Sequence, residues 1–326
     1  MTEKPHISLD KVRGMFMGAF LGDALGVPHE FRCNAKTPYT GILQHRGFMT
    51  SQYQGKKELE VGQVSDDSEL SLTLLRTIIN DRGYNKENII MSYLRWANSG
   101  GWMIGKNTRA LLRGVTTMKG YQGRMSKMLS TAASSQSNGA LMRCSPLALL
   151  WDNRAVIEDV NITNPNNVCL DCNLVYVNSL RLALQGIDGP SILIKAKEFA
   201  QTDEIKAVLT QVEKREARNI AESKGWCLHG LWCSMMAITS FKNYSEAMNW
   251  VITSQPGSDT DTNACIAGAL IGALLGFDKL QEEPSTNRNI TILLEANTDL
   301  GPTPRPAEYS PRDFYTLTEA AHALTL

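Results

Sequence analysis

Two apolar stretches of this 326-residue chain carry glycine at every fourth position, and this pattern constrains the fold more than any other. The glycines are Gly14, Gly18, Gly22 and Gly26 near the N-terminus, and Gly268, Gly272 and Gly276 far downstream. Residues four apart share one face of a helix, and a glycine inside a helix costs about 1 kcal/mol relative to alanine. Such a stripe lets another backbone approach closely. We therefore expect both helices at the centre of a bundle, where they could pack against each other.

Carboxylates lie at the ends of both glycine-striped segments. The first helix is expected to end near Asp23, and the second begins at Asp259 and Asp261. A close antiparallel crossing would bring these three side chains together at one end of the core. The glycine pattern thus connects the expected fold with a candidate site.

The other apolar residues also recur with a helical period, for example over residues 70–78, 174–184 and 314–324. Convincing alternation with a period of two is almost absent. No repeat of about 20 to 50 residues is visible, which argues against a solenoid. The sequence predicts a single all-α domain with an irregular loop from about residue 32 to residue 62.

Composition narrows the function classes. The chain has 33 Lys plus Arg and 33 Asp plus Glu, so it lacks the basic footprint of a nucleic-acid-binding protein. The longest early apolar run, residues 14–22, is too short to cross a bilayer, and no signal peptide is recognised. Seven scattered cysteines fit reduced core thiols. We expect a cytoplasmic protein with neither a membrane nor a nucleic-acid partner.

Two acidic clusters each open an expected helix. They are Ser65-Asp66-Asp67-Ser68-Glu69 and Ser258-Asp259-Thr260-Asp261-Thr262. Oxygen-only ligand sets suit a hard cation such as Mg²⁺ or Mn²⁺. Helix capping is the alternative, because Asp66 with Glu69 resembles a capping box and Asp259 or Thr260 could be an N-cap. Capping uses one carboxylate whereas each cluster supplies at least two, so a metal site is favoured.

Three further features are candidates for the same site. Asp23 is polar in an otherwise apolar run, and Glu30 follows it closely. Asn138-Gly139 opens an expected helix, whose free backbone N–H groups could cradle a phosphate. The alternatives are that Asp23 faces water at a helix end and that Asn138-Gly139 is an ordinary turn.

Together these motifs resemble the ADP-ribosylglycohydrolase family. The resemblance rests on Gly22-Asp23-Ala24-Leu25-Gly26 with Glu30, the two acidic clusters, the Asn138–Arg143 segment and the second glycine stripe, in the family's order. It implies a single-domain orthogonal helical bundle with a central dinuclear metal cleft that holds two Mg²⁺ ions, or Mn²⁺. We expect an N-terminal extension (1–10), the family domain (11–277) and a C-terminal extension (278–326) packed on or continuing that domain.

The resemblance also implies residue roles. The metal ligands it implies are Ser65, Asp66, Asp67, Asp259, Asp261 and Thr262. The substrate-binding residues it implies are Asp23, Asn138, Gly139, Asn164 and Ser258. Either Glu30 or Asp67 would be catalytic and take a proton from water. The implied activity cleaves the bond between the anomeric carbon of ADP-ribose and an acceptor on a protein or small molecule. The sequence leaves the oligomeric state open, and we take a monomer as the default.

Two substrate residues depart from the family's pattern. Asn164 stands where histidine is usual, and Ser258 stands where glycine is frequent. These departures keep two alternatives open: a non-catalytic relative that binds ADP-ribose or serves structurally, and a Mg²⁺-dependent phosphohydrolase. Residues 33–62 form a candidate lid. No feature of the sequence identifies the acceptor.

Overall fold

Helices make up most of the chain in the computed structural model, which describes residues 6–31, 38–43, 48–51, 55–101 and 104–326. The α-helices are α1 (Leu9–Gly26), α2 (Asp66–Asp81), α3 (Lys86–Asn98), α4 (Lys106–Leu112), α5 (Met118–Ala133), α6 (Asn153–Thr163), α7 (Asn167–Leu184), α8 (Gly189–Phe199), α9 (Asp203–Glu213), α10 (Cys227–Ser240), α11 (Tyr244–Thr253), α12 (Thr260–Leu275), α13 (Phe277–Glu282), α14 (Pro284–Glu295) and α15 (Phe314–His322). Short 3₁₀ helices are η1 (Val27–His29), η2 (Ser145–Leu150), η3 (Ala307–Tyr309), η4 (Pro311–Asp313) and η5 (Ala323–Thr325). The all-α class is confirmed.

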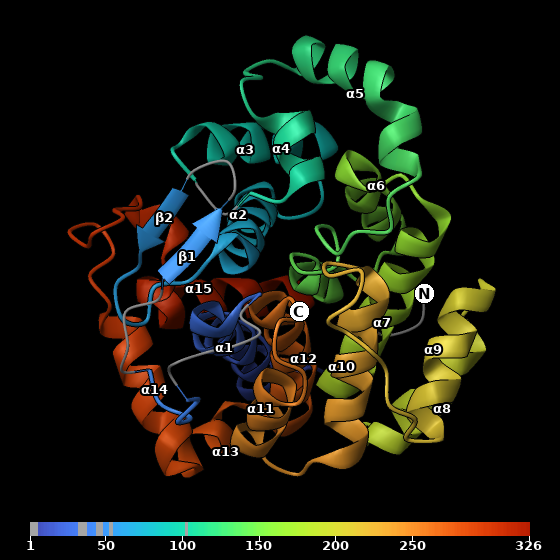
Figure 1. Cartoon of the computed structure of the whole chain (residues 1–326), viewed down its shortest axis with the longest axis vertical. Helices are drawn as coiled ribbons and strands as arrows, with labels where there is room; N and C mark the ends of the chain where they lie inside the picture. The colour runs from blue at the N-terminus through green and yellow to red at the C-terminus, as the bar shows by residue number, and fades with distance from the viewer. Residues whose placement is uncertain (1–5, 32–37, 44–47, 52–54, 102–103) are drawn as a thin grey trace.

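The two glycine-striped helices, α1 and α12, lie against each other at the centre of the fold (Figure 1). They run antiparallel, because Gly14 faces Gly272 whereas Gly22 faces Ala264. A Cβ placed on Gly18 would lie 2.1 Å from the carbonyl oxygen of Gly268, a distance that no real side chain tolerates. The close backbone contact expected from the sequence is therefore confirmed.

A layer of helices covers this central pair, and α3, α4, α5, α8 and α9 lie further out (Figure 1). Helices α7, α10 and α11 pack on α12, while α13, α14 and α15 pack on α1. Both central helices are apolar on all sides, which fits helices enclosed by neighbours. Within the described part of the chain, no helix is long and apolar enough to span a bilayer.

The loop expected over residues 32–62 is partly regular. It contains an antiparallel hairpin of β1 (Phe48–Ser51) and β2 (Gly55–Glu58), in which Phe48 pairs with Glu58. The strands have four residues each, too few for an alternating pattern to be recognised. The candidate lid, residues 33–62, includes residues 33–37, 44–47 and 52–54, which lie outside the described residues.

The C-terminal segment packs on the helical domain through a buried ion pair. The guanidinium of Arg305 donates from Nε and Nη2 to both carboxylate oxygens of Glu69 on α2, each at 2.7 Å. The Arg305 and Glu69 side chains are only 3% and 6% exposed. At the other end, the expected boundary at residue 10 falls inside α1, whose N-cap is Ser8.

We expect Gly18→Ala to lower the free energy of unfolding by about 3 kcal/mol or more, because the added methyl group must push the α1 and α12 backbones apart. Gly123→Ala in α5 is the matched control, since a Cβ there meets no atom within 4 Å. The control should change stability by about 1 kcal/mol at most, in the stabilising direction. Urea denaturation measures both, and equal effects would contradict the close packing of α1 on α12.

Arg305→Met should destabilise the fold by about 3 kcal/mol, because it leaves the Glu69 carboxylate buried without its cation. Arg312→Met is the control, since Arg312 pairs with Asp299 at a half-exposed position. Exposed pairs contribute about 1 kcal/mol or less. Thermal and urea denaturation of both variants test the difference, and a loss in Arg305→Met no larger than in the control would refute a structural role for the C-terminal segment.

Candidate functional site

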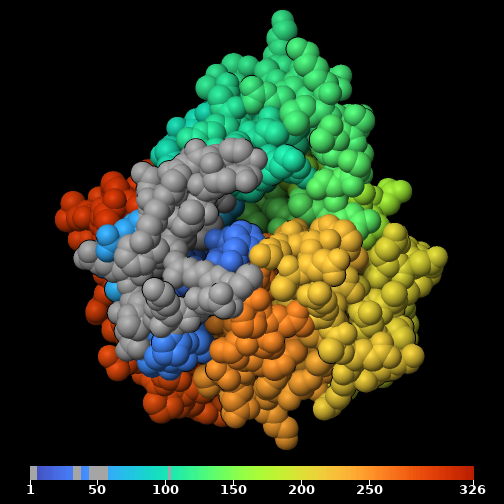
Figure 2. Space-filling model, in the orientation of Figure 1, coloured from blue at the N-terminus to red at the C-terminus, as the bar shows by residue number. Residues whose placement is uncertain are grey.

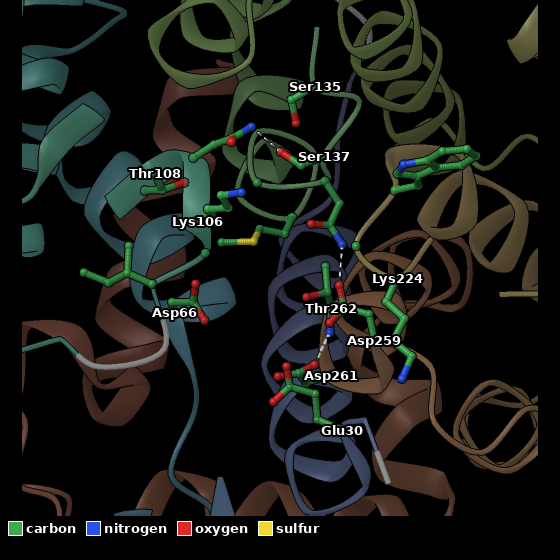
Figure 3. Close-up of a pocket in the computed structure, with 18 of the residues that line it drawn as sticks. Glu30, Asp66, Lys106, Thr108, Ser135, Ser137, Lys224, Asp259, Asp261 and Thr262 are labelled. Atoms are coloured by element: carbon green, nitrogen blue, oxygen red, sulfur yellow. Dashed lines mark hydrogen bonds between the residues drawn. The ribbon is translucent and has the colours of Figure 1, made fainter. Parts of the chain in front are cut away.

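A hollow of about 620 Å³ opens where the N-terminal ends of α2 and α12 meet. In Figure 2 the surface is depressed between the green segments and the yellow-to-orange segments that precede α12. Its lining includes residues that the sequence analysis singled out: Glu30, Asp66, Asn138, Gly139, Asp259, Asp261 and Thr262. Figure 3 shows the carboxylate of Asp66 on one side of the hollow and the carboxylates of Glu30, Asp259 and Asp261 on the other.

The start of α12 directs two carboxylates into this hollow. Asp259 occupies the N-cap position, but its side chain makes no capping hydrogen bond. Instead, Asp259 Oδ2 accepts a hydrogen bond from Asn138 Nδ2 at 2.7 Å (Figure 3). Asp261 Oδ1 accepts from the backbone N–H of Thr262 at 2.9 Å. The capping alternative therefore fails for the Asp259 side chain, which is held in the hollow by Asn138.

The start of α2 is organised by a carboxylate from α1. Ser65 is the N-cap, and its Oγ accepts from the backbone N–H of Asp67 and donates to Asp67 Oδ2. Asp23 Oδ2 accepts from the backbone N–H groups of Ser65 and Ser68, at 3.0 and 3.1 Å, and from Ser68 Oγ. Asp23 is fully buried rather than facing water, and it thus ties the end of α1 to the start of α2.

The capping-box interpretation of Asp66 with Glu69 is wrong. Glu69 does not return to the helix start; its carboxylate accepts from Arg305 and from Trp96 Nε1, the latter at 2.7 Å. The two partners lie on α3 and on the C-terminal segment, so no pattern local to α2 could reveal them. Asp66 is left with its side chain on the wall of the hollow.

Five carboxylates form two overlapping groups that could hold metal ions. Asp23, Asp67 and Asp261 make one group, and Glu30, Asp259 and Asp261 make the other. Within each group, one oxygen atom per residue lies within 4.8 Å of the others. Asp261 belongs to both groups, so a carboxylate at this position could bridge two cations. Among the described residues, Asp66 joins neither group although it lines the hollow.

Burial and mutual repulsion disfavour charge on these carboxylates. Burial, and then the neighbouring charges, raise the pKa of Asp66, Asp67 and Asp261 well above the usual range. Burial raises the pKa of Asp23 to about 6, although hydrogen bonds from Ser65 and Ser68 oppose this. Within the described part of the chain, Asp67 Oδ1 is buried and accepts no hydrogen bond. A divalent cation would relieve the repulsion and supply the missing partner, so these residues fit such an ion.

The sequence suggested that Asn138-Gly139 opens an α-helix. In the structure this segment is a turn that leads into η2. The turn is held by Arg143, whose Nη1 donates to the carbonyl oxygen of Gly139 at 2.8 Å. Arg143 is fully buried and pairs with Asp159 on α6 at 3.0 Å. Residues 144–150 are apolar and contain Pro146, so their pattern alone did not separate a 3₁₀ helix from an α-helix.

Asn164 supports the same turn from behind. Its Nδ2 donates to the carbonyl oxygen and Oγ of Ser137, at 3.0 and 2.8 Å, and its Oδ1 accepts from Thr163 Oγ1. The side chain is fully buried and lies outside the lining of the hollow, whereas Ser137 is part of it. Asn164 therefore positions Ser137, and a direct contact with substrate stays a prediction.

Comparison with known proteins identifies the family of this chain. Residues 4–289 match the family described as ADP-ribosylglycohydrolase. The chain belongs to the ADP-ribosylglycohydrolase family. The match reaches residue 289, beyond the boundary at residue 277 expected from the motifs, and it includes α13 and half of α14.

Several relatives of this glycohydrolase-family chain have informative names. The ADP-ribosyl-[dinitrogen reductase] glycohydrolase of Rhodospirillum rubrum is 31% identical over 287 residues, covering 83% of this chain and 87% of that protein. The ADP-ribosylarginine hydrolase Tri1 of Pseudomonas putida is 24% identical, covering 86% and 75%. A solved structure, an ADP-ribosylglycohydrolase-related protein complex, has a TM-score of 0.72 at 20% identity and covers 98% of this chain and 99% of its own. The last shows that the fold is shared.

Ser258 of this family member is buried and absent from the wall of the hollow. Its carbonyl oxygen accepts from the backbone N–H of Phe31 at 2.9 Å, which fixes the segment that carries Glu30. Asp23 and Ser65 also lie outside the lining. A substrate-binding role for Asp23 or Ser258 therefore stays a prediction. Neither residue lines the hollow, so a ligand in the hollow could not touch it without a rearrangement.

Three residues at the opening of the hollow are not marked by any pattern in the sequence. Phe31, Lys224 and Trp226 line it, and the two aromatic side chains are 46% and 39% exposed. The Lys224 ammonium lies 5.4 Å from the centre of the Phe31 ring. Gly225, with φ of 76°, lets this loop turn and accept a hydrogen bond from the Asn138 backbone. No local pattern marks Lys224 or Trp226, because their position depends on a contact with residues 136–138.

Asp261→Asn should have opposite effects on stability with and without a divalent cation. In EDTA the variant should be more stable than the unchanged chain, because it removes one repelled buried charge. With Mg²⁺ or Mn²⁺ the order should reverse, because the variant lacks the carboxylate that both candidate groups share. Asp203→Asn, at an exposed position in α9, is the control and should show no reversal. Melting temperatures in both conditions test this, and the same order in each would count against a metal at Asp261.

Proposed function

We propose that this chain is a divalent-cation-dependent hydrolase that releases ADP-ribose from an acceptor on a protein or small molecule. The proposal rests on two sets of three acidic residues that share Asp261 at the base of the hollow. Family membership supports ADP-ribosyl hydrolysis in general. The two overlapping groups suggest two ions, with Mg²⁺ preferred and Mn²⁺ as a substitute, because every candidate donor is an oxygen.

In this reaction a water oxygen attacks the anomeric carbon of the ribose while the bond from that carbon to the acceptor breaks. The water loses one proton to a base, and the acceptor atom leaves with a proton. Divalent ions bound here would orient ribose hydroxyls and lower the pKa of a water. Asp259 and Asp261 would hold such ions, and Asn138 would keep Asp259 in place.

Glu30 is the better candidate for the base. It lines the hollow, whereas Asp67 is 1% exposed, lies outside the lining and accepts a hydrogen bond from Ser65. A base must reach the proton that it removes, directly or through one water. We therefore assign the proton transfer to Glu30, which leaves Asp259 and Asp261 as the metal ligands of its group. Asp67 is assigned to metal binding, with Ser65, Asp66 and Thr262 supporting the ions.

The ADP-ribose moiety would lie along the turn at residues 135–139. Ser135, Ser137, Asn138 and Gly139 line that side of the hollow. Figure 3 shows Ser135 and Ser137 above the carboxylates. The acceptor would leave through the mouth beside Lys224. A monomeric state and a cytoplasmic location complete the proposal as predictions from the sequence.

The first test is release of free ADP-ribose from arginine-linked, serine-linked and O-acetyl substrates, with Mg²⁺ and with EDTA. At least one substrate should be cleaved only with the metal, and Asp261→Asn should abolish the cleavage while Asp203→Asn does not. No release from any substrate, despite measurable Mg²⁺ binding, would favour a binding or structural relative. Release of inorganic phosphate from nucleotides in place of ADP-ribose would favour a phosphohydrolase.

Glu30→Gln should lower kcat by about 100-fold to 10,000-fold, because it removes a general base and keeps the shape of the side chain. Glu246→Gln, at an exposed position in α11, is the matched control and should leave kcat unchanged. Mg²⁺ affinity measured by calorimetry separates loss of the base from loss of the metal. Full turnover in Glu30→Gln would exclude Glu30 as the base and return that role to Asp67.

A further inference from the structure

A second hollow, of about 400 Å³, lies at the far end of α7 from the carboxylate site. Its lining includes Trp151, Asn178 and Arg181, and it shares no lining residue with the first hollow. Cys169, near the start of α7, touches the carbonyl oxygens of Ser135 and Ser137 behind the first hollow. Arg181 is twelve residues further along the same helix, a distance of about 18 Å. The two hollows are therefore separate.

Arg181 is a buried cation without a carboxylate partner among the described residues, and it is 5% exposed. Nη1 donates to Asn153 Oδ1 and Asn178 Oδ1, at 2.5 and 3.0 Å, and Nη2 donates to the carbonyl oxygen of Leu147 at 3.3 Å. Nε has no partner within the described part of the chain. Burial lowers the pKa of Arg181 to about 10, partly opposed by Asp152. The groups that accept hydrogen bonds from Arg181 are all neutral oxygens, and Asp152 acts on it only at longer range.

Trp151 supplies a second unused donor beside the guanidinium. Its Nε1–H is buried and, among the described residues, has no acceptor. The Arg181 guanidinium carbon lies 5.8 Å from the centre of the Trp151 ring. A buried donor without a partner costs about 1 to 3 kcal/mol. Two such donors and an unpaired cation on the wall of one hollow indicate a missing acceptor that carries negative charge.

We propose that this second hollow binds a small oxyanion, the phosphate or carboxylate group of a metabolite. Guanidinium groups bind both in a fork of two parallel hydrogen bonds. Arg181 could free Nη2 for the anion by giving up its long contact with Leu147, and the indole of Trp151 would donate from the side. The residues that line the hollow include no acid, and the Asp152 carboxylate acts on Arg181 from outside the lining. The site is independent of the proposed hydrolase activity.

The test follows the indole N–H resonance of Trp151 in ¹H–¹⁵N spectra, assigned by its loss in Trp151→Phe. Inorganic phosphate and sodium acetate are titrated separately at constant ionic strength set with chloride. We expect a saturable shift with at least one of them, and the comparison identifies the preferred oxyanion. If neither anion gives a saturable shift, the proposal is overturned.

Two arginine variants show whether the shift comes from this site. Arg181→Gln should weaken the affinity by more than about tenfold, because hydrogen bonds to charged groups contribute about 1.5 to 3 kcal/mol. Arg154→Gln, whose side chain is 83% exposed on α6, should leave it unchanged. If Arg181→Gln does not fold, Trp151→Phe is titrated with the Arg181 Nε–H resonance as reporter, and its affinity should fall about fivefold or more. Unchanged affinity in the variant that folds would overturn the proposal.

Discussion

The contact between the backbones of α1 and α12 is the constraint on which the rest of this structure depends. Glycine is the only residue that permits it, since a methyl group on Gly22 would lie 2.1 Å from the carbonyl oxygen of Ala264. The same contact positions the chemistry, because a Cβ on Gly26 would lie 2.4 Å from the Cα of Asp261. The spacing between the helices thus also fixes the carboxylate that both candidate metal groups share. Fold and site rest on one set of interatomic distances.

The carboxylates at the end of this helix pair work against the stability of the fold. Their pKa values are raised because burial and like charges disfavour ionisation. Donors from Ser65, Ser68 and Asn138 offset part of that cost. Two buried ion pairs support the walls of the hollow. Arg143, paired with Asp159, holds the turn at Gly139, and Arg305, paired with Glu69, holds α2. The carboxylates that ionise least readily are thereby concentrated where a cation would bind.

The sequence was sufficient for the features that depend on residue spacing. The glycine stripes predicted the antiparallel helix pair. The acidic clusters supplied Asp67, Asp259 and Asp261 to the converging carboxylates, whereas Asp66 joins neither group. The sequence was insufficient where a side chain is satisfied by a distant partner. Glu69 resembles a cap and is bound by Arg305, 236 residues away, while Lys224 reaches the hollow through a loop pairing with residues 136–138. The hairpin of β1 and β2 was missed for a different reason, because four-residue strands are too short to show a period.

The pairing of α1 with α12 also has a consequence for how the protein is made. Helix α1 is synthesised first, yet the surface that its glycines fit is completed only with residue 275. Until then α1 lacks its packing partner, and the ribosome-bound chain exposes the apolar surface of this helix. Exposed apolar surface of this kind promotes aggregation. Contacts between residues this far apart also slow folding. The centre of the fold therefore cannot form before α12 has been synthesised, up to residue 275.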